Sequence, residues 1–297
     1  MSIRLEMLQV ARLAPKILGD VAGMVADFFA RHQSEDGGFK GRTGESDLYY
    51  TVFGMDGLIA LERTPDYERL AAYVKGFGDG EGLDFVHLCC LARCWSELKK
   101  QGKELPLDVE RLQGRIEEYR SGDHGYNARA GSESGTAYGA FLAVGAHQDL
   151  GCEVPRVMKL VQSLKLLERE DGGWANEPSM RMSSTNSTAA AVTVLRNLNM
   201  PLNPGPIADY LFKLFHEQGG FLAAPQAPMP DLLSTATTLH ALSGLQVPLR
   251  KAAKEACLDY IDTLWTNEGA FHGNWADEFL DVEYTSYGLL ALGHLAV

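Results

Sequence analysis

One short turn motif, repeated at nearly constant spacing, limits the possible folds of this chain more than any other sequence feature. Three copies have the sequence Gly-Gly-aromatic and two copies are weaker, and all of them have flanking acids or amides. The aromatic residues are Phe39, Tyr126, Trp174, Phe221 and Phe271. Successive intervals between them are 87, 48, 47 and 50 residues. A period in this range is typical of supersecondary units that stack on one another.

The first interval is nearly twice the others, and the glycines of residues 76–82 supply a degenerate turn inside it. The chain therefore contains six units of roughly 48 residues. Residues 157–167 and 207–215 carry apolar side chains at helical spacing with charged side chains facing away. We expect such amphipathic segments to form an outer layer of helices.

The segments that follow the turns are of a different kind. They are apolar nearly all round and rich in alanine, glycine, serine and threonine, so they are expected to be buried helices that approach one another closely. They span residues 47–61, 84–95, 136–146, 185–195, 232–245 and 282–296.

The alternation of these two helix types predicts an all-α fold. We expect residues 1–297 to form a single domain, an α6/α6 toroid with six inner and six outer helices. An open solenoid such as a HEAT array has a similar period, but the inner helices here are too apolar for an exposed inner face. No alternation of period two is long enough to predict a sheet.

Composition excludes several classes of function. Lys and Arg number 27 against 39 Asp and Glu, a formal charge of −12, which argues against a nucleic-acid partner. No run of 18 apolar residues exists, so no membrane span is expected. The N-terminal stretch places Arg12, Lys16 and Asp20 among apolar residues and indicates an amphipathic helix. Five cysteines, three of them crowded together, indicate no disulfide framework and favour a cytoplasmic location.

An acid and a threonine at the start of an apolar helix follow several turns after about ten residues, as in residues 47–51, 231–235 and 281–287. With the turns, these segments resemble the superfamily of protein prenyltransferase β subunits and squalene-hopene-type cyclases, from Gln33 onward. The resemblance implies an α6/α6 toroid whose apolar central cavity accepts an isoprenoid or a similar apolar molecule. It also implies a possible helical protein partner, because the transferases work with a helical-repeat α subunit.

In the transferases an aspartate, a cysteine two residues later and a histidine of the final repeat hold a zinc ion. Here Asp231 matches the aspartate, but Leu233 and Tyr284 stand at the other two positions. Residues 225–230 also lack the basic side chains that grip a diphosphate. We therefore expect no metal and no cofactor, and chemistry that is independent of zinc if the protein is an enzyme.

The cyclases use an Asp-x-Asp-Asp motif whose central acid is kept neutral so that it can protonate an alkene. Asp231 lies where such a motif would start, while Leu233 and Ser234 replace the later acids. The candidate catalytic residues are Asp231, Asp281 and Tyr284. The alternative for the repeated aspartates is that they cap helix N-termini.

Aromatic residues gather near the starts of the inner helices. Around a cavity their faces would suit an isoprenoid or a carbocation, and equally they could fill the core. The candidate ligand-binding residues are Tyr49, Tyr50, Tyr138, Trp174 and Tyr287.

Three further interpretations remain. Paired acids at residues 35–36, 170–171 and 277–278, with Trp174 and Trp275, would suit a carbohydrate-active α/α barrel, although acids that recur with the turn fit turn chemistry better. The missing zinc and diphosphate ligands are compatible with a non-enzymatic, protein-binding toroid. Asp84, His87, Cys90 and Cys94 share one helix face, where core packing is favoured over metal binding.

Overall fold

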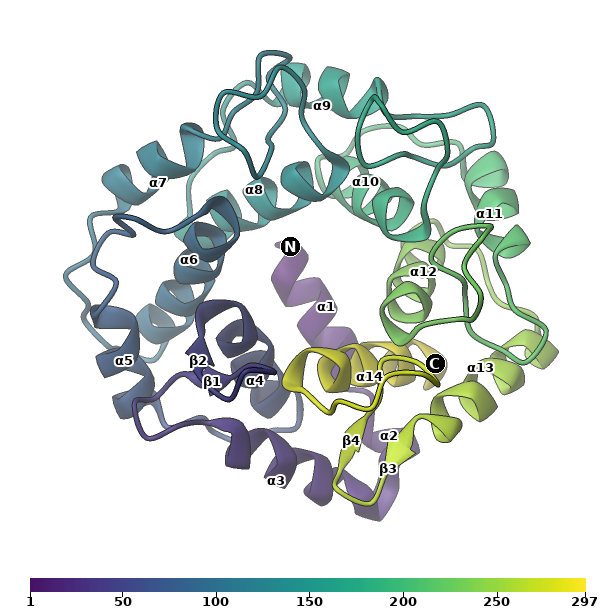
Figure 1. Ribbon diagram of the computed structural model, residues 1–297, viewed down its shortest axis with the longest axis horizontal. Coiled ribbons are helices and arrows are strands. Elements are labelled where there is room, and N and C mark those ends of the chain that lie inside the picture. The colour runs from purple at the N-terminus through teal and green to yellow at the C-terminus, as the bar shows by residue number, and fades with distance from the viewer.

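The turns and helices build a closed ring of two helical layers in the computed structural model, which describes residues 1–297 (Figure 1). The inner layer consists of α4 (Leu48–Ala60), α6 (Phe85–Lys100), α8 (Ala137–Leu150), α10 (Thr185–Asn197), α12 (Leu232–Gly244) and α14 (Val282–Leu295). The outer layer consists of α3 (Ala22–His32), α5 (Tyr67–Lys75), α7 (Val109–Glu117), α9 (Val157–Lys165), α11 (Pro204–Lys213) and α13 (Lys251–Thr263). Each inner helix packs against its neighbours, and α14 packs against α4. The predicted α6/α6 toroid is confirmed.

The turn aromatics lie between the two layers, where they are almost completely buried. In four repeats the backbone N–H of the aromatic donates to a buried threonine hydroxyl, as Phe221 does to Thr235 over 3.0 Å. That hydroxyl donates in turn to the carbonyl of the N-cap residue, here Asp231, over 2.8 Å. The recurring acid and threonine at these helix starts therefore tie each turn to the inner helix that follows it.

The turn glycines join neighbouring repeats. Gly219 has φ +90°, and a Cβ atom there would fall 1.9 Å from the carbonyl oxygen of Ala256 on the next outer helix. Only glycine fits such a backbone conformation at so close an approach. Gly269 makes the same approach to Met24 of α3, which links the last repeat to the first.

Two hairpins accompany these turns, although no sheet was expected. Strand β1 (Phe39–Lys40) pairs with β2 (Ser46–Asp47), and β3 (Trp265–Thr266) pairs with β4 (Ala270–Phe271), each antiparallel. Each strand is two residues long and belongs to a turn, which is too short to produce a period-two pattern.

The N-terminal segment adds α1 (Ile3–Ala11), α2 (Pro15–Leu18) and a 3-10 turn (Gly19–Val21) to the toroid. The expected helix is present, but it ends at Ala11 and lies across the central opening of the ring (Figure 1), in contact with α4, α8, α10 and α14. Arg4 of α1 forms ion pairs with Asp56 (2.6 Å) and Glu97 (2.9 Å). No helical segment combines the length and the hydropathy that a membrane span requires.

Candidate functional site

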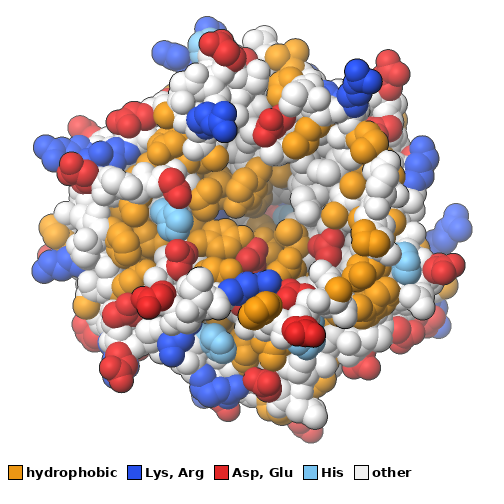
Figure 2. Space-filling model, viewed as in Figure 1, with side chains coloured by type: hydrophobic (Ala, Val, Ile, Leu, Met, Phe, Trp, Pro, Cys, Tyr) orange, Lys and Arg blue, Asp and Glu red, His pale blue; other side chains and the backbone are white.

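A cavity of about 400 Å³ lies inside the inner ring, and 14 of its 20 lining residues are hydrophobic. Figure 2 shows a hollow at the centre of the ring with hydrophobic side chains gathered on its walls. Met7 of α1 is among the lining residues, so the N-terminal helix forms part of the cavity wall. Proteins bind drug-sized ligands in mostly apolar clefts of about 300–1,000 Å³.

The same positions of each inner helix face the cavity. The second residue after the N-cap lines it in five of the six helices, and the sixth residue in all six, because residues four apart share one helix face. The second positions are Tyr49, Tyr138, Asn186, Leu233 and Glu283, and the sixth are Phe53, Cys90, Leu142, Ala190, Thr237 and Tyr287.

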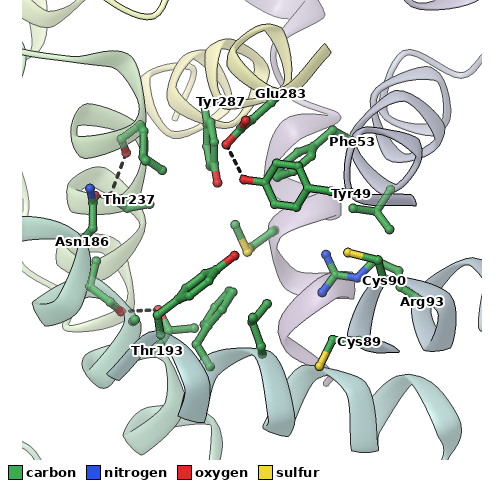
Figure 3. A pocket seen from close by; sticks show the side chains of 18 of the residues that line it. Tyr49, Phe53, Cys89, Cys90, Arg93, Asn186, Thr193, Thr237, Glu283 and Tyr287 are labelled. Carbon is green, nitrogen blue, oxygen red and sulfur yellow. Dashed lines mark hydrogen bonds between the residues drawn. The ribbon is translucent and has the colours of Figure 1, made fainter. Parts of the chain in front are cut away.

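Glu283, in the first turn of α14, is the only acidic residue of the cavity lining. Its Oε1 accepts a hydrogen bond of 2.5 Å from the hydroxyl of Tyr49, and Figure 3 shows the two side chains directed toward each other. Burial raises the pKa of Glu283 to about 7, against the opposing effect of the Tyr49 hydrogen bond. A carboxyl group with such a pKa exchanges its proton near neutral pH, which suits a general acid or base.

Arg93 of α6 is the one lysine or arginine of the lining. Its Nε donates to Asp149 Oδ2 over 3.2 Å, and its guanidinium points into the cavity (Figure 3). His240 of α12 also lines the cavity; burial lowers its pKa to about 4, so the imidazole is neutral at pH 7.

The three candidate catalytic residues lie at helix starts, outside the cavity lining. Asp231 caps α12 by accepting from the backbone N–H of Ser234 over 2.7 Å. Asp281 caps α14 by accepting from the N–H of Tyr284 over 2.8 Å, and it also accepts from Arg42 over 2.7 Å. The ring of Tyr284 packs under the Arg42 guanidinium. Asp231 and Asp281 thus act as helix N-caps, which is the alternative role that the sequence offers for these aspartates.

Three of the five candidate ligand-binding residues, Tyr49, Tyr138 and Tyr287, line the cavity, whereas Tyr50 and Trp174 do not. Trp174 is the aromatic of a turn, and its side chain is buried between the two layers. Tyr50 packs edge-on against Tyr49 and is half-buried.

The paired acids and the helix face of Asp84, His87, Cys90 and Cys94 make contacts that stabilise turns, helices and the core. In two of the acidic pairs the second residue, Asp36 or Asp171, accepts from the N–H two residues on, in Gly38 or Gly173, over 3.0 Å, as turn chemistry requires. His87 bridges the carboxylates of Asp84 (2.8 Å) and Asp47 (3.1 Å). Of the two cysteines on that helix face, Cys94 is buried in the core and Cys90 lines the cavity.

Sequence reasoning missed Glu283, Arg93, Asn186, Thr237 and His240. The signal that could have found most of them is distance from the N-cap, since Glu283 follows the cap residue Asp281 by two positions. The motifs in the sequence point instead to the cap residues themselves, Asp231 and Asp281.

The sequence pattern described as the prenyltransferase alpha-alpha toroid domain matches residues 26–169 and 164–292. The chain belongs to this family. No curated protein matches the toroid at the sequence level.

Solved structures with the same fold share little sequence with this toroid. A variant of the type II terpene cyclase MstE from Scytonema, in complex with geranylgeranyl dihydroxybenzoate, has TM-score 0.62 and 12% identity, covering 95% of this chain and 97% of that one. Protein geranylgeranyltransferase-I from Candida albicans, complexed with GGPP, has TM-score 0.60 and 14% identity, covering 84% and 90%. A glycosidase in complex with glucose has TM-score 0.57 and 12% identity, covering 97% of each chain. At these identities the similarity shows the fold alone.

Leu233 lies in the cavity lining, and Tyr284 lies outside it. No three His, Cys, Asp or Glu side chains come close enough together to hold a metal ion.

Proposed function

We propose that this toroid binds an isoprenoid or a similarly apolar small molecule in its central cavity. The observation that carries the proposal is the apolar space of about 400 Å³ enclosed by the inner helices and α1. Each CH₂ group that a ligand buries there contributes about 0.8 kcal/mol, so a branched hydrocarbon chain suits these walls. The isoprenoid compounds bound in the MstE and geranylgeranyltransferase-I structures support the same ligand class.

The open cavity favours a small ligand over the alternative of a toroid that only binds proteins, for which a filled centre would be expected. A carbohydrate-active barrel would need two carboxylates across one cleft, and Glu283 has no acidic partner in this cavity.

Filling the cavity from within tests the proposal. Ala190 lines the cavity on α10, so Ala190→Phe occupies ligand space, whereas Ala252→Phe adds the same ring to the exposed surface of α13. We expect geraniol, farnesol or geranylgeraniol to bind the wild-type protein and the Ala252→Phe variant alike, measured by isothermal titration calorimetry. Ala190→Phe should weaken binding by about tenfold or more, a loss of about 1.4 kcal/mol. Failure of all three alcohols to bind, or equal binding by both variants, would overturn the proposal.

Glu283 favours a second candidate function, proton transfer to an alkene of the bound molecule. The O–H bond of the neutral carboxyl would break as a C–H bond forms, leaving a carbocation next to the aromatic faces of Tyr49, Phe53 and Tyr287. Loss of a neighbouring proton to the Glu283 carboxylate would then form a new alkene and restore the acid.

Deuterium incorporation tests this second function. Incubation of farnesol or geranylgeraniol with the protein in D₂O should yield isomerised or cyclised product containing deuterium, detected by mass spectrometry. Glu283→Gln should abolish the product. Asp231→Asn and Asp281→Asn test the aspartates singled out from the sequence, and we expect both variants to keep activity when folded. Activity in Glu283→Gln, or no product from any isoprenoid, would exclude this role.

A further inference from the structure

Arg93 presents hydrogen-bond donors to the cavity that no protein group accepts. Its Nε donates to Asp149, whereas neither terminal nitrogen has a hydrogen-bond partner. The side chain is 22% exposed, and it lines both the main cavity and a smaller one beside α1. A guanidinium carries five N–H groups in a planar fork, so the four on the terminal nitrogens remain without a protein acceptor.

The charges around Arg93 argue against a strongly anionic ligand. The Arg93 charge is opposed by the buried carboxylate of Asp149. The neighbouring Arg4 is already paired with both Asp56 and Glu97. Two guanidinium groups thus face three carboxylates at this end of the cavity, which leaves no positive charge to compensate a diphosphate.

Other side chains of the lining also offer donors without partners. Tyr138 and Tyr287 also line the cavity, and neither hydroxyl group has a hydrogen-bond partner within the protein. The Asn186 amide group lies beside Thr237, whose hydroxyl is 3.0 Å from the Asn186 oxygen and 2.8 Å from the Leu233 carbonyl (Figure 3). Most of the cavity wall is therefore apolar, but a few of its side chains carry hydrogen-bond donors.

A pure hydrocarbon would displace water from these donors and leave them unpaired, which weakens binding. A ligand with an acceptor oxygen replaces that water and keeps the donors satisfied. A neutral oxygen does so without adding charge beside Asp149 and Glu283.

Resting on the proposed function, we infer that the natural ligand is an uncharged, oxygenated isoprenoid-like molecule whose carbonyl or ether oxygen accepts hydrogen bonds from the Arg93 guanidinium. The hydrocarbon part contacts the aromatic and aliphatic walls. Arg93 is then the residue that selects an oxygenated ligand over a hydrocarbon or a diphosphate.

Three probes of matched length test this inference on the full chain: farnesylacetone, the hydrocarbon with the same carbon skeleton, and farnesyl diphosphate. Affinities are measured by competition against the isoprenoid alcohol that binds best. We expect the ketone to bind about tenfold or more tightly than either other probe.

A double substitution removes the donors without leaving a buried carboxylate unpaired. In Arg93→Met with Asp149→Leu, the ketone should lose its advantage over the hydrocarbon. The control, Arg115→Met with Asp79→Leu, removes an arginine–aspartate pair outside the cavity lining and should keep the preference.

Equal binding of ketone and hydrocarbon by the wild-type protein would overturn the inference, as would a preference for the diphosphate. A ketone preference that survives in the Arg93→Met, Asp149→Leu variant would also overturn it. If none of the probes and no isoprenoid alcohol binds, the proposed function itself fails, and the two failures are thereby distinguished.

Discussion

Glu283 carries the only carboxyl group of the cavity wall, and its pKa is raised well above the usual value for glutamate. Burial strips water from its carboxylate and raises its pKa, the negative charge of Asp281 acts in the same direction, and the Tyr49 hydroxyl opposes both. The resulting pKa of about 7 lies above the usual 4.5, so the folded protein holds this proton at pH values where the unfolded chain has lost it. The ionised carboxyl therefore destabilises the fold at high pH.

This shift makes stability depend on pH in a defined direction. Between about pH 4.5 and 7 the folded state binds more protons than the unfolded state, so the free energy of unfolding falls as pH rises and stays lower above pH 7. A shift of this size corresponds to about 3 kcal/mol at most. In Glu283→Gln this contribution should vanish. Urea denaturation at about pH 5 and about pH 8 tests this, because the free energy of unfolding should change less between the two pH values in the variant than in the wild type. Tyr49→Phe removes the hydrogen bond that lowers the pKa of Glu283, so the pH at which stability falls should move upward. If the stability of Glu283→Gln depends on pH as strongly as that of the wild type, the assigned pKa is wrong.

At the scale of helices, the inner layer could be predicted from the sequence because its signals are local. The caps, the apolar faces and the repeat period all lie within one unit, so the expected segments match the observed inner helices closely at their starts. Helix α6 runs five residues beyond the expected end at Trp95, through Lys100, because these residues favour helix although they are not all apolar. The residues that face the cavity stand at fixed distances from the N-caps, but which distances these are becomes clear only from the geometry of the ring.

The position of α1 could not be predicted, because the contacts that hold it are not local. Arg4 forms ion pairs with Asp56 of α4 and Glu97 of α6, which lie 52 and 93 residues further along the chain. No local sequence pattern predicts ion pairs between residues so far apart. The helix is short and only weakly amphipathic, so its own sequence does not specify which surface it covers. This buried ionic contact ties α1 to the inner helices α4 and α6.

Removing the Arg4 side chain should therefore release α1. Arg4→Met leaves Asp56 and Glu97 without their cation, and breaking a buried pair in this way costs about 3–5 kcal/mol. We expect a matching loss of unfolding free energy in urea and faster amide hydrogen exchange throughout α1. Arg12→Met, at an exposed position with no ion pair, should change stability by less than about 0.5 kcal/mol. Slow exchange of α1 in the Arg4→Met variant would show that apolar packing alone holds it.

At the scale of the whole molecule, closure of the ring depends on a seam between the first and last repeats. Helix α4 packs on α14, Ser286 donates to the carbonyl of Phe53 over 3.0 Å, and Gly269 lies against α3. Arg42, in the loop between β1 and β2, reaches across the seam. Closure was expected because the inner helices are too apolar for an open arc, but sequence could not indicate which side chains join the ends.

Arg42 forms ion pairs across this seam, and its substitution tests how much they stabilise the closed ring. Its Nε and Nη2 donate to Asp281 and Asp277, both over 2.7 Å. Because Arg42 is partly exposed and Asp281 keeps its capping hydrogen bond, we expect Arg42→Gln to cost only about 1–2 kcal/mol. The loss should concentrate at the seam, as faster hydrogen exchange in residues 39–47 and 272–281 than in the opposite side of the ring. Arg63→Gln, which breaks a longer and exposed pair with Asp27, is the control and should leave exchange unchanged. If exchange in Arg42→Gln rises equally around the ring, the toroid opens as one cooperative unit and the seam is not its weakest point.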